Sequence, residues 1–188
     1  MRECDMLVAR EHRISPETIR NIFTGLNDGL VSTLGAISGY FAAFHNHQTI
    51  IFAATLIEAT AGSLSMGAGA FVAIDSERET RSLLQQNSEI PAAPAKWDRP
   101  LRAAMIVGGS YVAGAAVTAA PLLFGAASSL ASWFTAGLAI MAVSFFLASM
   151  TGMNLKKRIV VNVCILVATA LITSGVGELV QLFWNTNK

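Results

Sequence analysis

The sequence predicts an all-α integral membrane protein with five transmembrane helices, its N-terminus in the cytosol and its C-terminus outside. Of its 188 residues, 53% are hydrophobic and only 13% are charged, about half the charged fraction usual in a soluble domain. The mean hydropathy is +0.53. Lys and Arg residues lie outside the long apolar runs rather than within them. These three observations carry the prediction.

Five apolar runs are long enough to cross a bilayer, whose hydrocarbon core of about 30 Å needs roughly 20 helical residues. They cover residues 22–44, 49–74, 103–127, 129–153 and 159–184, and the third and fourth contain no charged residue. A buried helix of a soluble protein can have this composition, but five such runs in one short chain favour a membrane protein. The segment before the first run has no apolar stretch, so we expect no cleaved secretory signal.

The orientation follows from the basic residues. Twelve of the thirteen Lys and Arg lie in the N-terminal tail, in the segment 75–102 and in the segment 154–158, and only Lys188 falls on the other side. Because cytosolic loops are enriched in Lys and Arg, these three segments are predicted to be cytosolic. Residues 75–102 should form a short cytosolic loop, which leaves the chain as a single transmembrane domain.

Two helix boundaries can be predicted from proline. Ser15 followed by Pro16 is typical of a helix start, so either a short interfacial helix precedes the first span or that span begins early. Pro121 lies late in the third run and should kink or end that helix. The third and fourth spans should then form a tight hairpin through residues 125–128.

Three carboxylates, Asp28, Glu58 and Glu178, fall within the predicted spans, and no Lys or Arg does. An ionised carboxylate at the bilayer centre costs about 2.5–3.5 kcal/mol or more. Such a group must be protonated, hydrated in a cavity, or paired with a cation that the protein does not encode. A cation pathway meets all three conditions.

Asp28 and Glu58 lie on neighbouring antiparallel spans at related depths. With a rise of about 1.5 Å per residue, Asp28 lies about 9 Å from the cytosolic start of its span and level with Met66, whereas Glu58 lies about two turns further out. Both carboxylates stand in stripes of small residues on one helical face, namely Asp28, Ser32, Gly35 and Gly39 on the first span and Glu58, Gly62, Ser65, Met66 and Gly69 on the second. Close helix packing explains the small residues, but it requires no buried acid.

The residue types narrow the choice of ion. Carboxylate oxygens beside a thioether favour a borderline transition metal over Mg²⁺ or Ca²⁺, which prefer shells made only of oxygen. Methionine alone is a weak signal, because it commonly fills gaps in a core. Asp28, Glu58 and Met66 together predict a site for Fe²⁺ or Mn²⁺ as the transported ion, with no resident cofactor. Because carboxylates titrate, the same site could exchange metal for protons.

Two segments resemble signature sequences of the vacuolar iron transporter family. Residues 27–33, Asn-Asp-Gly-Leu-Val-Ser-Thr, are similar to its "DGLVST" motif, and residues 58–69 are similar to its "E…AGxxSMxxG" stretch. The Pro-Leu-Leu segment at 121–123 and the five-span layout also agree. The resemblance implies a homodimeric antiporter that exports Fe²⁺, and often Mn²⁺, from the cytosol in exchange for protons. It also implies that Asp28, Glu58 and Met66 line the ion path at the dimer interface.

The sequence departs from the family pattern in two places. The family usually continues its second motif as "GEY", but this chain has Gly69, Ala70 and Phe71, so one carboxylate is missing. Many members carry a long, Glu-rich metal-binding domain between the second and third spans, where this chain has only the segment 75–102. This short linker resembles the nodulin-like branch of the family, and it leaves metal selectivity and regulation open.

Other polar residues have weaker claims to a functional role. His45 and His47 form an i, i+2 pair in a short outer loop, which is a poor chelate without further ligands. Glu77 and Glu79 could attract ions to the cytosolic mouth, but a solvated helix end explains them as well. Glu178 is either an exit carboxylate or a side chain that reaches the outer surface.

Two other function classes remain open beside the transporter: a non-transporting membrane scaffold or metal sensor, and a divalent-cation channel. The sequence has no nucleophile–base pair and no Gly-rich phosphate loop, so we expect no enzymatic activity and no nucleic-acid partner. The expected partners are a divalent metal ion, protons, the lipid bilayer and a second copy of the chain. The short linker and the lack of an organellar sorting signal favour a bacterial plasma (inner) membrane, or a vacuolar membrane if the source is eukaryotic.

Overall fold

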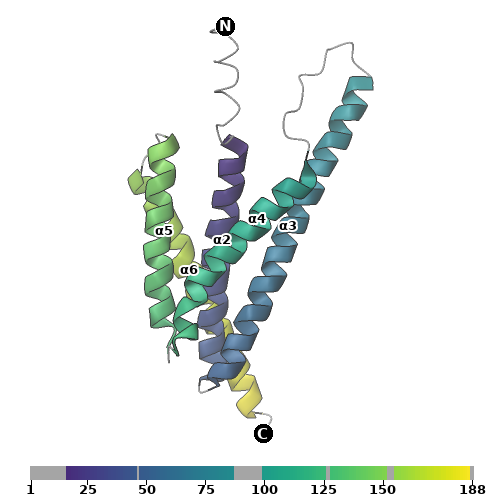
Figure 1. Ribbon diagram of the computed structural model, residues 1–188. Helices are drawn as coiled ribbons and strands as arrows, with labels where there is room; N and C mark the ends of the chain where they lie inside the picture. The colour runs from purple at the N-terminus through teal and green to yellow at the C-terminus, as the bar shows by residue number, and fades with distance from the viewer. Residues whose placement is uncertain (1–15, 46, 87–98, 126–127, 152–154, 187–188) are drawn as a thin grey trace.

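The computed structural model describes residues 16–45, 47–86, 99–125, 128–151 and 155–186, which form an all-helical bundle (Figure 1). The prediction of an all-α fold is confirmed. The helices are α2 (Pro16–Phe44), α3 (Gln48–Gln86), α4 (Pro100–Leu123), α5 (Leu130–Thr151) and α6 (Leu155–Thr186).

Four of these helices, α3 to α6, are long and apolar enough to cross a membrane. The helix α2 has 29 residues but is less apolar, because Asn27, Asp28 and several Gly, Ser and Thr residues lie in its middle. It is nevertheless the central helix, since it packs against each of the other four. The one described helix that does not qualify as a membrane span by its apolar content is therefore the one that packs among the others (Figure 1).

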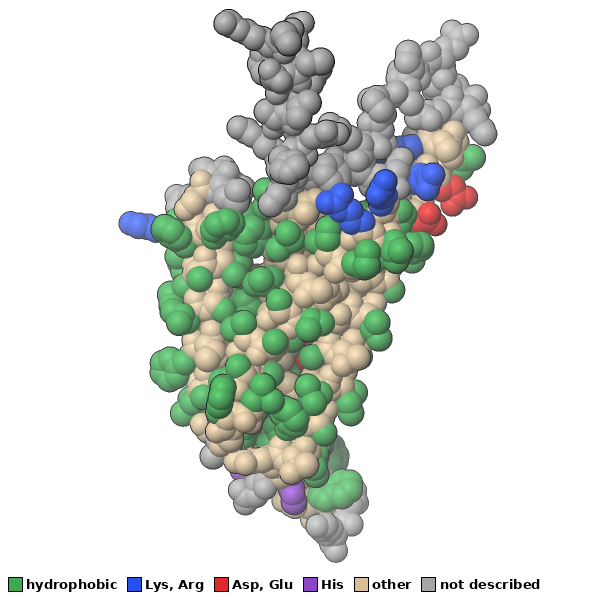
Figure 2. Space-filling model, in the orientation of Figure 1, with side chains coloured by type: hydrophobic (Ala, Val, Ile, Leu, Met, Phe, Trp, Pro, Cys, Tyr) green, Lys and Arg blue, Asp and Glu red, His purple; other side chains and the backbone are tan. Residues whose placement is uncertain are grey.

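The side chains are distributed as in a membrane protein. Large apolar residues such as Phe134 and Leu138 are 79% and 68% exposed, respectively. The interior, in contrast, contains polar residues: Thr33, Ser38, Thr55, Thr118, Ser132 and Ser144 are all buried. Lys and Arg gather at one end of the visible face and His at the opposite end, with a largely apolar surface between them (Figure 2). The composition and packing are those of an integral membrane protein.

The helices α2 and α4 cross with their backbones in contact. A Cβ atom added to Gly29 would lie 2.2 Å from the backbone oxygen of Tyr111, and one added to Gly114 would lie 2.3 Å from the backbone oxygen of Leu26. Real side-chain carbons do not approach backbone oxygens so closely. Glycine at these two positions therefore sets the distance between α2 and α4, as small residues commonly do between membrane helices.

Several helix ends differ from the sequence prediction. The segment 75–102 is not a loop throughout, because α3 continues to Gln86 and α4 begins at Pro100. No Gly or Pro interrupts residues 75–86, and an ion pair between Glu77 and Arg81 supports the helix one turn apart. At 39 residues, α3 is about 58 Å long, well beyond the thickness of a bilayer core.

The predicted effects of the two prolines can also be compared with the structure. The helix α2 begins at Pro16 and continues without a break to Phe44. Of the two predicted alternatives, the structure therefore has the early start of the first helix and not a separate short helix before it. The helix α4 ends at Leu123, two residues after Pro121. Gly125 then takes a positive φ of 77°, a conformation that glycine adopts without strain, and the chain reverses toward α5.

Replacing Gly114 with Ala should separate α2 from α4 and destabilise the protein by about 1–3 kcal/mol, as overpacking usually does. Gly109→Ala is the matched control, because it lies on the same helix and has open space around its Cα. The control should be neutral or stabilising by up to about 1 kcal/mol, owing to the helix propensity of Ala. Thermal unfolding of the two purified variants in detergent measures the difference, and equal unfolding temperatures would contradict the packing described for Gly114.

Candidate functional site

The Glu58 carboxylate accepts hydrogen bonds from three hydroxyl groups on two other helices. Ser32 Oγ on α2 donates to Glu58 Oε1 at 2.8 Å and Thr33 Oγ1 donates to Oε2 at 3.2 Å. The Tyr111 hydroxyl on α4 donates to Oε1 at 2.7 Å. In the described part of the chain no basic side chain forms an ion pair with Glu58. The carboxylate is therefore fixed in position by neutral donors, which leave its charge uncompensated.

Gly62 makes room for the phenol that contacts Glu58. A Cβ atom at Gly62, one helical turn from Glu58 on α3, would lie 2.2 Å from the Tyr111 hydroxyl oxygen. The Tyr111 side chain is only 1% exposed, and its hydroxyl also lies 3.0 Å from Ser32 Oγ. Because each hydroxyl carries one proton and can accept another hydrogen bond, Tyr111, Ser32 and Glu58 form a continuous hydrogen-bonded group.

A second group of polar side chains lines a pocket of about 430 Å³ next to this network. Asp28 and Asn27 of α2 and Met66 of α3 all line it. The Asn27 Oδ1 atom is buried and accepts no hydrogen bond from the described residues. The pocket thus combines a carboxylate, a thioether and an amide oxygen that accepts no hydrogen bond from the described residues. All three groups can act as metal ligands.

Two arginines also line the Asp28 pocket, which the sequence analysis did not foresee. Arg20 and Arg158 lie outside the predicted spans, but both helices extend beyond those limits: α2 begins at Pro16 and α6 at Leu155. The longer helices bring both guanidinium groups to the pocket that contains Asp28. The surroundings of Asp28 are therefore less negative than the sequence alone indicates.

The two groups lie next to each other along α2. Asp28 and Ser32 are one turn apart, a rise of about 6 Å, and the Asp28 and Glu58 carboxylates are close enough to interact electrostatically. The described residues nevertheless contain no cluster of three His, Cys, Asp or Glu side chains that could hold a metal ion. The structure brings Asp28 together with Met66, and places Glu58 in an adjacent hydroxyl network rather than in the same pocket.

The remaining candidates lie apart from these two groups. Glu178 on α6 is exposed, as are His45 and His47 at the α2–α3 turn. Gly35 and Gly39 belong to helix packing, since their Cα atoms face Thr169 and Thr173 of α6. Their place in the polar stripe of the sequence reflects close packing rather than a ligand site.

Comparison with known proteins finds a family that is similar to the segment with Asp28, Glu58 and Met66. Residues 19–90 match the model of the VIT family. Over these residues, which are less than half of the chain, the sequence is similar to the VIT family. The matched segment includes all of α3 and most of α2, and with them Asp28, Glu58 and Met66.

Curated relatives match the same part of the chain. The vacuolar iron transporter of Centaurea cyanus is 35% identical over 88 residues, which are 45% of this chain and 36% of that protein. Vacuolar iron transporter 1 of Arabidopsis thaliana is 31% identical over 86 residues, 45% of this chain and 34% of the relative. The similarity therefore spans about a third of the length of these relatives.

Tyr111 lies on α4, outside the residues that match the VIT model. The sequence analysis missed this residue. A phenol in a charge-free run of small residues was the available signal, because a buried tyrosine hydroxyl normally has a hydrogen-bond partner.

A double-mutant cycle tests the bond between Tyr111 and Glu58. Tyr111→Phe and Glu58→Ala should show a coupling free energy of about 1.5–3 kcal/mol, the usual range for a hydrogen bond to a charged group. The unfolding free energies of the single and double variants in detergent give this value. Trp133→Phe, which removes a hydrogen bond to Ser38 on another side of α2, should be additive with Glu58→Ala. Additivity in both cycles would mean that the Tyr111 contact contributes nothing.

Proposed function

We propose that this chain transports Fe²⁺ or Mn²⁺ out of the cytosol in exchange for protons. The observation that carries the proposal is the half-buried Glu58 carboxylate, fixed by hydroxyl donors without a basic partner, beside a pocket that contains Asp28 and Met66. A fixed cation would neutralise such a site permanently. A mobile cation neutralises it only while bound, which suits transport.

The ligand types favour a transition metal in the Asp28 pocket. The carboxylate of Asp28 and the amide oxygen of Asn27 are ligands that any divalent cation accepts, whereas the thioether of Met66 adds a soft ligand that Mg²⁺ and Ca²⁺ do not use. Because the Asn27 oxygen accepts no hydrogen bond from the described residues, a bound cation would satisfy it. Asp28, Asn27 and Met66 are thus the residues proposed to receive the ion.

Proton exchange is proposed because Glu58 has no basic partner among the described residues, although Arg20 and Arg158 line the pocket with Asp28. When the metal leaves, Asp28 and Glu58 remain as two negative groups within electrostatic range, and binding a proton relieves their repulsion. The linked hydroxyls of Ser32 and Tyr111 next to Glu58 could pass that proton along hydrogen bonds. Metal and proton therefore compete for the same charge.

The proposed orientation has the Lys- and Arg-rich end of the bundle in the cytosol. The first residue of α2 and the last residue of α6 lie at opposite ends of the bundle (Figure 1), which suits five crossings including α2. A homodimer is part of the proposal, since α3 exposes apolar residues such as Ile57 and Leu64, each 69% exposed, on the helix that carries Glu58 and Met66. The short segment between α3 and α4 supports a proposed place in the nodulin-like branch. The proposed location is a bacterial plasma membrane or, in a eukaryote, a vacuolar membrane.

Transport by sealed vesicles tests the two acids. Vesicles that contain the protein should take up Fe²⁺ when a proton gradient is imposed, and Asp28→Asn or Glu58→Gln should reduce uptake to the level of protein-free vesicles. Glu178→Gln is the matched control, because it removes an exposed carboxylate of α6 and should leave uptake unchanged.

The same assay separates the alternatives. Electrogenic Fe²⁺ flux without proton movement would identify a channel, and metal binding without flux would identify a sensor or scaffold. Normal uptake by both acid variants would refute the assignment of Asp28 and Glu58.

Met66→Leu should change metal selectivity, because leucine keeps the volume of the side chain but removes the sulfur. We expect the apparent affinity for Fe²⁺ to fall at least about tenfold, as loss of a metal contact usually causes, and the preference for Fe²⁺ over Mg²⁺ to fall with it. Met105→Leu, at a 63% exposed position of α4, is the control. An unchanged Fe²⁺-to-Mg²⁺ preference in the Met66 variant would exclude the thioether as a ligand.

A further inference from the structure

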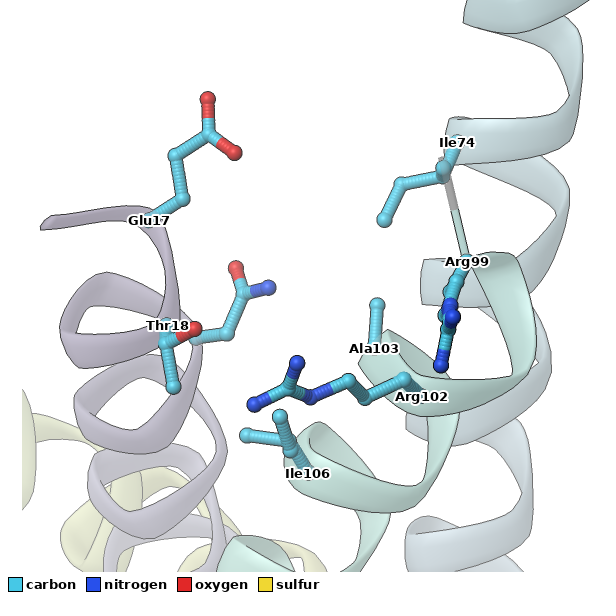
Figure 3. Close-up of a pocket in the computed structure, with 8 residues that line it drawn as sticks. Glu17, Thr18, Ile74, Arg99, Arg102, Ala103 and Ile106 are labelled. Atoms are coloured by element: carbon cyan, nitrogen blue, oxygen red, sulfur yellow. The ribbon is translucent and has the colours of Figure 1, made fainter. Parts of the chain in front are cut away.

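A separate pocket of about 300 Å³ lies at the Lys- and Arg-rich end of the bundle, between α2, α3 and α4 (Figure 3). It shares no lining residue with the Asp28 pocket. Its polar lining consists of Arg99 and Arg102 at the start of α4 and of Glu17, Thr18 and Asn21 at the start of α2. Its charged groups are two guanidinium groups and one carboxylate.

The two arginines stand where a helix usually avoids basic residues. Arg99 is the N-cap of α4, forms no side-chain capping hydrogen bond, and is followed by Pro100; the first turn contains no acidic residue. The N-terminus of a helix carries a partial positive charge and favours anions. Arg99 and Arg102 increase the positive charge there instead of balancing it.

The carboxylate in the pocket is explained by its own helix. Glu17 lies in the first turn of α2, where an acidic residue stabilises the helix N-terminus. In Figure 3 the Glu17 carboxylate points away from the Arg102 guanidinium, whereas the Arg102 side chain extends from α4 toward Thr18. The local sequence preferences of α2 thus account for Glu17, but those of α4 do not account for its arginines.

From this arrangement we infer that the pocket between α2 and α4 binds a phosphate group, carried by an anionic lipid headgroup or by a soluble phosphate. Guanidinium groups match phosphate oxygens in a bidentate manner, and Arg99 and Arg102 bring two of them to one pocket. Thr18 and Asn21 line the pocket on the facing helix.

The apolar part of the pocket suits a lipid. Ile74, Ala103 and Ile106 line it beside the arginines, so a headgroup at Arg99 and Arg102 would have apolar surface next to it for the start of an acyl chain. Basic pockets between membrane helices on the cytosolic side typically bind anionic headgroups. This inference does not depend on the proposed metal transport, because it concerns a different pocket.

Native mass spectrometry of the full chain in a neutral detergent, titrated with phosphatidylglycerol, tests the inference. Arg99→Gln/Arg102→Gln should weaken lipid binding at least tenfold. The control Arg78→Gln/Arg81→Gln removes the same charge from the exposed end of α3 and should bind within twofold of wild type. Equal binding by the two double variants, whether weakened or not, would overturn the proposal.

A second pair of variants covers the case in which the glutamine variant does not fold. Ile106→Trp fills the pocket while keeping both arginines and should also weaken binding at least tenfold, whereas Ile165→Trp at an exposed position of α6 should not. Wild-type affinity in a folded Ile106→Trp protein would overturn the proposal. Competition with inorganic phosphate distinguishes the sources: displacement of the lipid assigns the pocket to soluble phosphate, and retention assigns it to the lipid headgroup.

Discussion

The structure depends on holding a carboxylate inside a helical bundle without a basic partner. Glu58 on α3 receives hydroxyl donors from Ser32 and Thr33 on α2 and from Tyr111 on α4. Burying a charged group is costly unless it is hydrogen-bonded, so these contacts fix the relative positions of three helices. The backbones of these helices also approach closely.

Glycine provides that approach. Gly29 and Gly114 bring α2 and α4 into backbone contact, and Gly62 leaves the space that the Tyr111 phenol occupies. A Cβ atom at any of the three would meet an atom within 2.3 Å. Because membrane helices gain little from burying apolar surface against each other, close packing and hydrogen bonds must supply the specificity of the bundle. The same glycines thus shape both the fold and the candidate site around Glu58.

The sequence was sufficient to predict the all-helical fold and that Asp28 and Met66 lie at one level. It was insufficient for what depends on the lengths of the helices and on their contacts. Apolar runs and a 1.5 Å rise placed Met66 level with Asp28, and the structure has both residues lining one pocket. The extra length of α2 and α6, which brings Arg20 and Arg158 to that pocket, could not be predicted because hydropathy marks where a helix leaves the membrane, not where it ends. Residues 75–86 of α3 are polar, so hydropathy does not show that the helix continues through them.

Tyr111 shows a different limit. Tyr111 and Glu58 are far apart in the sequence, and their hydrogen bond depends on how α3 and α4 cross. The periodicity of a single helix gives no information about that crossing. Gly62 was expected to serve helix packing, but its contact with the Tyr111 phenol depends on how α3 and α4 cross. Burial cost identifies an acid that needs partners; only the packed bundle identifies the partners.

The beginning of α2 connects the two pockets at the Lys- and Arg-rich end. Thr18 and Asn21 line the arginine pocket with α4, while Arg20 and Asp28 line the other pocket with α3, α5 and α6. Because both sets of side chains lie on one helix, any shift of this end of α2 moves residues of both pockets. An anion held between α2 and α4 would restrain that end of the helix, and with it the mouth of the cavity that contains Asp28 and Met66. In this arrangement the anion proposed for one pocket and the metal ion proposed for the other would act on the same helix, α2.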